Sequence, residues 1–194
     1  MSKSSGRWQE IESQFTSLLN SKESFDEFFE LARQLFEARA QSYTGTRKPP
    51  INLRLLSHDG NYRVCISPSW DSRFYQIGSK IRIEVMRQEL LDTGLYHFRK
   101  AMTVMVSEST LKLCSVYSKH LVNATDAMAS VFTEFIKDPE SVLARDSNHC
   151  ACCGRALTDG TSRARGVGPE CVTHLWMFGF KKPVISASEL FATT

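Results

Sequence analysis

The chain has 194 residues, of which 42% are hydrophobic and 23% charged, and its formal net charge is +3 at pH 7. These fractions are those of an average soluble globular protein, so they predict a buried core and exclude wholesale disorder. The opening segment MSKSSGRWQEIESQF has no apolar signal-peptide core, and the longest apolar runs, such as AMTVMV, are too short to span a bilayer. We therefore expect a cytoplasmic protein with no membrane-spanning segment.

Two amphipathic helices are predicted at the N-terminus. Apolar residues recur at helical spacing over residues 8–19 and again over residues 24–41, where Ser24 and Glu27 form a capping box. We expect an antiparallel helical pair over residues 1–46, whose apolar stripe packs on the rest of the protein. The alternative use of this stripe is to bind a partner or a second copy of the chain.

An antiparallel sheet of four or five strands is predicted next, because the hydrophobic period changes to two. Two extended runs flank His58-Asp59-Gly60-Asn61, which is a hairpin signal. Residues 79–85 alternate apolar and charged side chains. Residues 95–108 favour a strand over a helix because they are rich in aromatic residues and valine.

Two helices are predicted to follow the sheet. Residues 124–137 carry one apolar face, and a short helix then starts with Asp138 as its N-cap and Pro139 at its first position. Together with the strands they complete a segment, residues 47–146, that we expect to form one sheet-and-helix domain.

The six cysteines fall into two groups. Cys65 and Cys114 stand alone in extended segments, and we interpret both as small buried hydrophobes. The other four lie between residues 150 and 171. In a compartment that keeps thiols reduced, such clustering favours metal ligands over disulfides.

The clustered cysteines have the spacing of a zinc site. Cys150-x-x-Cys153 is typical of a zinc knuckle, a tight turn that brings two thiolates to one cation. Pro169 fits the first position of a helix, which would place Cys171 and His174 on one face of its opening turn. We therefore predict zinc as the cofactor. The predicted ligands are Cys150, Cys153, Cys171 and His174, with His149 or Cys152 as alternatives to His174.

The segment between the two ligand pairs contains Asp159-Gly160, which fits the two-residue turn of a hairpin. A knuckle, a hairpin and a helix with the last two ligands form a treble clef, which we expect over residues 147–194. Four protein ligands close a zinc site to water, so the metal is expected to be structural. It would supply folding free energy that so small a module lacks.

No catalytic constellation is found in the sequence. Treble-clef nucleases need a general-base histidine within the hairpin, and RALTDGTSRARG contains none. No H-x-E motif precedes the cysteines, as a zinc deaminase would require, and there is no Walker, dinucleotide-binding or G-x-S-x-G motif. We expect a protein without enzymatic activity.

Basic residues are concentrated in the middle of the chain and in the cysteine module. Residues 47–120 carry 12 Lys and Arg against 6 Asp and Glu, and they interleave with aromatic residues in a mixture that suits phosphate contact and base stacking. An ordinary sheet with its arginines in solvent is the alternative. The predicted nucleic-acid contacts are Arg63, Arg73 and Arg82 in the sheet region and Arg155, Arg163, Arg165 and Lys181 in the module.

The string CCGRALTDGTSRARGVGPEC resembles a small zinc-binding domain of unknown function that recurs in bacteriophage, plasmid and actinobacterial proteins. The family pattern is a knuckle ending in C-G-R-x-L-T-D, a serine a few residues on, and then G-x-G-P-x-C. It falls on Cys150, Cys153, Gly154, Arg155, Leu157, Thr158, Asp159, Ser162, Gly166, Gly168, Pro169 and Cys171. His174 departs from the pattern, since many relatives carry a basic residue there. The resemblance implies a phage-like context and, because some relatives handle nucleic acids, a similar role by analogy.

These patterns together predict an α+β protein: an N-terminal helical pair, an antiparallel β-sheet, two short helices and a C-terminal treble-clef zinc module. The expected function is that of a non-enzymatic, phage-type accessory protein that binds DNA or RNA through its basic sheet and hairpin. The alternative is a phage-type protein that binds and modulates a host or defence protein, using the N-terminal helices or the sheet face, with zinc purely structural.

Overall fold

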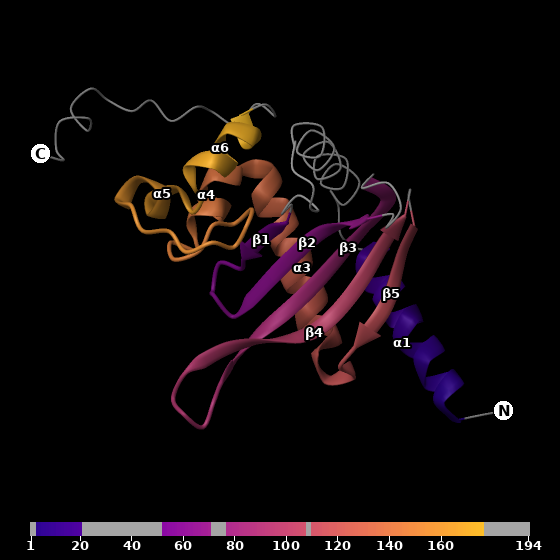
Figure 1. The fold of residues 1–194 in the computed structure, drawn as a ribbon. Coiled ribbons are helices and arrows are strands. Elements are labelled where there is room, and N and C mark those ends of the chain that lie inside the picture. The colour runs from indigo at the N-terminus through magenta and orange to yellow at the C-terminus, as the bar shows by residue number, and fades with distance from the viewer. Residues whose placement is uncertain (1–2, 21–51, 71–76, 108–109, 177–194) are drawn as a thin grey trace, which may run out of the picture.

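The computed structural model describes residues 3–20, 52–70, 77–107 and 110–176, and it confirms the α+β class (Figure 1). The elements in chain order are α1 (Lys3–Asn20), β1 (Leu53–Leu56), β2 (Tyr62–Trp70), β3 (Ile77–Leu90), β4 (Tyr96–Ser107), β5 (Thr110–Val116), the 3-10 helix η1 (Ser118–His120), α3 (Leu121–Lys137), α4 (Pro139–Ala144), α5 (Gly160–Arg165) and α6 (Pro169–Trp176).

The five strands form one antiparallel sheet in the order β1-β2-β3-β4-β5, so each strand pairs with its neighbour in sequence. The predicted turn at residues 58–61 joins β1 to β2. Asp59 Oδ1 accepts hydrogen bonds from the Ser57 hydroxyl at 2.6 Å and from the Asn61 N–H at 3.1 Å. Gly60 has a φ of 73°, a left-handed conformation that glycine adopts without strain. The hairpin and the sheet were therefore predicted correctly.

The core lies between one face of the sheet and helices α3 and α1. Alternate residues of the strands point into it, as in the buried pair Val64 and Ile66 of β2, and α3 crosses behind the strands (Figure 1). The apolar face of α3 contributes Phe132 and Phe135, both fully buried. Each such side chain contributes about 1.5–3 kcal/mol when it leaves water.

The apolar stripe of α1 is used in this core. Phe15 is only 2% exposed, and Trp8 and Ile11 pack against the same cluster while α1 lies along α3. The described half of the predicted helical pair therefore packs on the domain through Phe15, with Trp8 and Ile11 partly buried beside it. The other half, predicted over residues 24–41, lies outside the described residues.

The junction of α3 and α4 follows the sequence prediction closely. Asp138 is the N-cap of α4, its Oδ1 accepts a hydrogen bond from the Ser141 N–H at 3.1 Å, and Pro139 occupies the first helical position. Such a cap satisfies one of the free N–H groups at a helix start.

The interpretation of Cys114 as a buried residue was wrong, because its side chain is exposed; Cys65 is half-buried. In β5, Leu113 points into the core, and the register shifts between Thr103 and Val104 of β4, so Cys114 has no paired residue opposite it. A bulged residue on an edge strand is displaced from the ladder, which leaves this thiol in solvent.

Arg145, at the end of α4, links two helices to the sheet. Its guanidinium forms an ion pair with Glu134 of α3 and donates a hydrogen bond to the carbonyl oxygen of Leu56 at 3.1 Å. Burial opposes ionisation of Glu134, but hydrogen bonds from Ser130 and Arg145 outweigh it and hold the pKa of this carboxyl below its ordinary value.

Replacing Arg145 with methionine is expected to lower the free energy of unfolding by about 1.5–3 kcal/mol, since the variant cannot form two hydrogen bonds that involve a charged group. The folded-state pKa of Glu134 is depressed, so its contribution is complete above the ordinary value of 4.5 and is lost as the pH falls through the lowered one. The difference between wild type and variant should therefore shrink at acid pH. Urea unfolding across the acid range measures it, with Arg155→Met, from an exposed ion pair, as a nearly silent control.

Candidate metal centre

Residues 149–156 form the predicted knuckle. The turn is closed by hydrogen bonds from the Cys150 N–H to the Arg155 carbonyl and from the Gly154 N–H to the Cys150 carbonyl, both at 2.8 Å. His149 and Ala156 form an isolated antiparallel bridge at its base. Gly154 has a φ of 73°, which allows the tight turn after Cys153.

The knuckle is bonded to the edge of the sheet at β1. The Asn52 N–H donates to the Cys152 carbonyl at 3.1 Å, and the Arg54 N–H donates to the Ala151 carbonyl at 2.7 Å. The Arg54 guanidinium also fills the space beside Gly154, where an added Cβ would lie 1.4 Å from Nη1. The cysteine module therefore docks on the sheet, as Figure 1 shows beside β1.

The predicted hairpin around Asp159-Gly160 is wrong, because residues 160–165 form the short helix α5. Asp159 is its N-cap, with Oδ1 accepting from the Ser162 N–H at 2.8 Å, and Gly166 ends it in a left-handed conformation with a φ of 66°. The carboxylate therefore satisfies a helix N–H instead of shaping a hairpin turn. The module is a knuckle, a short helix and a second helix, without the hairpin of the expected treble clef.

The second ligand-bearing element is α6, which starts at Pro169 as predicted and carries Cys171 in its first turn. The Gly168 N–H, just before α6, donates to Cys150 Sγ at 3.4 Å. The Sγ atoms of Cys150, Cys153 and Cys171 all lie within 4.8 Å of one another. Because zinc–sulfur bonds are about 2.3 Å long, sulfurs around one tetrahedral ion are about 3.8 Å apart, so small shifts would fit the three cysteines to a metal ion.

The thiols of the cluster perturb one another. Hydrogen bonds from the thiols of Cys152 and Cys171, together with the N–H of Gly168, hold the pKa of Cys150 well below its usual value. The same bond to Cys150, with burial added, raises the pKa of Cys171 to about 12. Cys152 likewise has a raised pKa because it donates to Cys150. When thiols lie this close together, the cluster favours a single thiolate with the other sulfurs protonated. A bound cation would instead favour the thiolate form of each cysteine that it contacts.

The candidates for a fourth ligand differ in position. His174 is on α6, but its side chain lies outside the described part of the structure. His149 is exposed, and its Nδ1 lies 3.7 Å from Asp146 Oδ1, outside the group of neighbouring ligand atoms found among the described residues. Cys152 is half-buried and also lies outside that group of three, although its thiol is near enough to those of Cys150 and Cys171 to have a raised pKa. Cys152 is therefore nearer the cluster than His149 without being one of its three converging sulfurs.

The arginines predicted to contact nucleic acid in the module lie on its surface. Arg155 is 75% exposed and 3.6 Å from Glu170, a contact too open to hold it firmly. Arg163 donates to the Asn148 side chain at 3.3 Å, and Arg165 donates to the Thr161 carbonyl at 3.3 Å.

The arginines predicted in the sheet have carboxylate partners. Arg63 pairs with Asp146 at 2.9 Å and stacks on the Phe98 ring, 4.1 Å from its centroid. Arg82 pairs with Glu84 at 2.6 Å. The contact between Arg63 and Asp146 has no signal in the local sequence, because the two residues are 83 positions apart. Arg73 and Lys181 lie outside the described residues.

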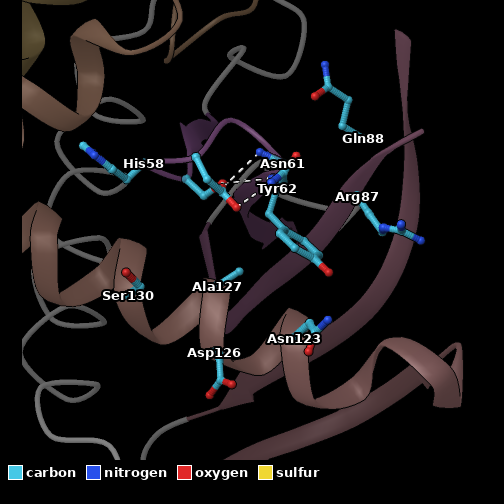
Figure 2. A pocket seen from close by; sticks show the side chains of 11 residues that line it. His58, Asn61, Tyr62, Arg87, Gln88, Asn123, Asp126, Ala127 and Ser130 are labelled. Atoms are coloured by element: carbon cyan, nitrogen blue, oxygen red, sulfur yellow. Dashed lines mark hydrogen bonds between the residues drawn. The ribbon is translucent and has the colours of Figure 1, made fainter. Parts of the chain in front are cut away.

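A cavity of about 620 Å³ lies between the β1–β2 turn, β3 and α3 (Figure 2). Asp59 in its wall is already engaged by Ser57 and Asn61. The side chains of His58, Arg87 and Gln88 point away from one another, whereas polar groups converge in a ligand site (Figure 2). The cavity is lined by Ser57, His58, Asp59, Asn61, Tyr62, Arg87, Gln88, Asn123, Asp126, Ala127 and Ser130.

Two further findings bear on the class of protein. Within the described ranges, none of the helices combines the length and apolar character needed to cross a bilayer. No curated protein and no solved structure matches the chain. A family model described as a family of unknown function, DUF6011, matches residues 144–175, which run from the end of α4 through the knuckle and α5 into α6. This match and the cysteine cluster fit the small zinc-binding domain of unknown function that the sequence resembles.

Proposed function

We propose that the protein is a non-enzymatic, phage-type accessory protein that holds one structural zinc ion and binds nucleic acid through the arginines beside it. The observation that carries the metal part is the convergence of three sulfurs, from Cys150, Cys153 and Cys171, within 4.8 Å. Soft thiolates in a tetrahedral arrangement favour zinc. His174 remains the proposed fourth ligand, and Cys152 is its alternative.

The role assigned to zinc is structural. The ligand-bearing parts are a knuckle and the first turn of a short helix, and the cysteines at 150 and 171 are nearly excluded from solvent. A fourth protein ligand would leave no position for a reacting water. The ion would fix α6 against the knuckle and, through the knuckle, hold the whole module on β1.

The nucleic-acid part of the proposal is supported by the arginines of the module. Arg155 and Arg163 are exposed and Arg165 is partly exposed, and all three come from a segment that the knuckle and α5 hold in a defined shape, which would give phosphate contacts a rigid support. Arg63 and Arg82 are paired with carboxylates, so we assign them a smaller share of any phosphate contact.

The triple variant Arg155→Ala/Arg163→Ala/Arg165→Ala is expected to bind nucleic acid at least about tenfold more weakly at low salt. The slope of log affinity against log salt concentration should also fall by about 0.9 for each phosphate that the variant no longer neutralises. Fluorescence anisotropy with labelled single-stranded DNA, duplex DNA and RNA, each over a salt series, measures both quantities.

A second triple variant controls for net charge. Arg7, Lys112 and Lys119 are exposed on α1, β5 and η1, elements that do not belong to the module, so their replacement by alanine removes the same three charges. We expect this variant to bind nearly as well as the wild type. Equal losses in the two variants would show a nonspecific charge effect, and no salt-dependent binding by the wild type would refute the nucleic-acid proposal.

A further inference from the structure

Strands β3 and β4 extend beyond the rest of the sheet. Tyr62, where β2 begins, pairs with Arg87 of β3, and Val116, where β5 ends, pairs with Met102 of β4. The pairing of β3 with β4 nevertheless continues to Leu90 opposite Tyr96. Gln88, opposite Phe98, still donates to the Asn61 carbonyl, so residues 89–97 form a two-stranded arm that projects from the sheet, at the lower left of Figure 1.

The arm has a defined shape at its tip and at its base. At the tip the Leu91 N–H donates to the Leu95 carbonyl at 2.8 Å, and the Gly94 N–H donates to the Leu91 carbonyl at 2.9 Å. At the base Phe98 lies under the guanidinium of Arg63, which also pairs with Asp146. A lone two-stranded hairpin is only marginally stable, and these contacts supply the missing support.

Large apolar side chains are gathered at the tip of the arm. The exposed fractions are 61% for Leu90, 41% for Leu91, 66% for Leu95 and 66% for Tyr96. Among the described residues only two other large hydrophobic side chains, Tyr117 and Val122, are exposed, and both lie near the start of α3. Single exposed leucines scattered over a protein surface are normal and need no explanation. A cluster of large apolar side chains on a projecting, ordered hairpin is instead typical of a contact surface.

We propose that the tip of the arm docks into an apolar pocket of another protein, and that this pocket has a cationic side chain at its rim. Asp92 is exposed at the turn, between Leu91 and Leu95, so a partner that buries the leucines meets its carboxylate as well. A protein pocket can pair that charge, whereas a lipid interior cannot. This inference goes beyond the proposed nucleic-acid function and does not depend on it.

The same charge argues against the other occupants of the tip. Asp92 at the turn would repel the phosphates of a nucleic acid, whereas Glu89 is paired with Arg99 at 3.4 Å. In the described part of a second copy, the cavity of Figure 2 offers the tip mostly polar residues. We therefore assign the tip to a pocket on a different protein, where a few apolar anchors would supply most of the binding energy.

The test compares three forms of the full-length, tagged protein: wild type, Leu91→Ser/Leu95→Ser, and the control Tyr117→Ser/Val122→Ser, which changes exposed hydrophobic residues elsewhere. All three should have the same far-ultraviolet circular dichroism, since the changed side chains are exposed. Each is incubated with nuclease-treated lysate from the cells that express the protein. A protein retained by wild type and control but not by the tip variant is then purified.

The affinity of each variant for that purified protein then tests whether the tip of the arm is the docking surface. We expect the double tip variant to bind at least about 30-fold more weakly than wild type, Asp92→Lys about tenfold more weakly, and the control variant within about twofold. The proposal would be overturned if wild type and tip variant retained the same proteins. It would also be overturned if the captured protein bound the Leu91, Leu95 and Asp92 variants as tightly as wild type. Sedimentation showing a wild-type dimer that the tip variant loses, or tip-dependent binding to vesicles of phosphatidylcholine and phosphatidylglycerol, would overturn it too.

Discussion

Replacement of Cys171 by serine is expected to abolish stoichiometric zinc binding and to unfold the module while the sheet survives. Cys171 is the proposed ligand that would tie α6 to the knuckle, and the described module has few buried apolar side chains of its own. Zinc supplies about 10–16 kcal/mol of apparent free energy to small modules of this kind, far more than the typical stability of a domain. Metal analysis and amide hydrogen exchange over residues 144–176 measure the two effects.

Cys114→Ser is the matched control for this experiment, because Cys114 is an exposed thiol remote from the cluster. It should keep one equivalent of zinc and normal protection from exchange. Wild-type protein that carries less than about half an equivalent of zinc would contradict a structural zinc site, given the affinity such sites have. A Cys152→Ser variant that also loses the metal would identify Cys152 as the fourth ligand in place of His174.

Gly166→Ala is expected to lower the free energy of unfolding by about 3 kcal/mol or more, even with metal bound. Gly166 has a φ of 66°, and a Cβ there would lie 1.8 Å from the carbonyl oxygen of Leu143 in α4. That neighbour is backbone and cannot rotate away. The Gly166 carbonyl also accepts from the Ala151 N–H, so any shift would disturb the knuckle.

Gly160→Ala separates this clash from the general effect of replacing a glycine. Gly160 begins α5, and an added Cβ there meets nothing within 4 Å. We expect this variant to be as stable as wild type or slightly more so, since alanine restricts the unfolded chain. Urea denaturation of both variants gives the comparison, and equal stabilities would show that the α4–α5 contact yields easily.

Local patterns predicted the parts of the fold that depend on local physics. The period-two alternation of β3, the Asp59-Gly60 turn and the Asp138-Pro139 helix start each follow from residues near one another in sequence. The cysteine spacing likewise predicted the three sulfurs that the structure brings together.

The predictions were wrong or incomplete where one local sequence pattern is compatible with two structures, or where a contact between residues far apart in the chain determines the structure. Asp159-Gly160 suits a hairpin turn and a helix N-cap equally, and the left-handed Gly166 six residues later was the available signal for a helix. The contacts of Arg63 with Asp146 and of Arg54 with Gly154 join segments far apart in the chain. These contacts form only when the module docks on the sheet, and the spacing of residues along the sequence does not predict that docking.

The hydrogen bonds between the knuckle and β1 also have a consequence for how the protein is made. β1 is an outer strand of the sheet, and among the described residues the N–H groups of Asn52 and Arg54 on its outer side are bonded by residues translated about a hundred positions later. Until that segment emerges and folds, the strand is open to pairing with another nascent chain, the usual route to β-aggregation. Truncated versions that end before residue 149 would lack these two hydrogen bonds permanently.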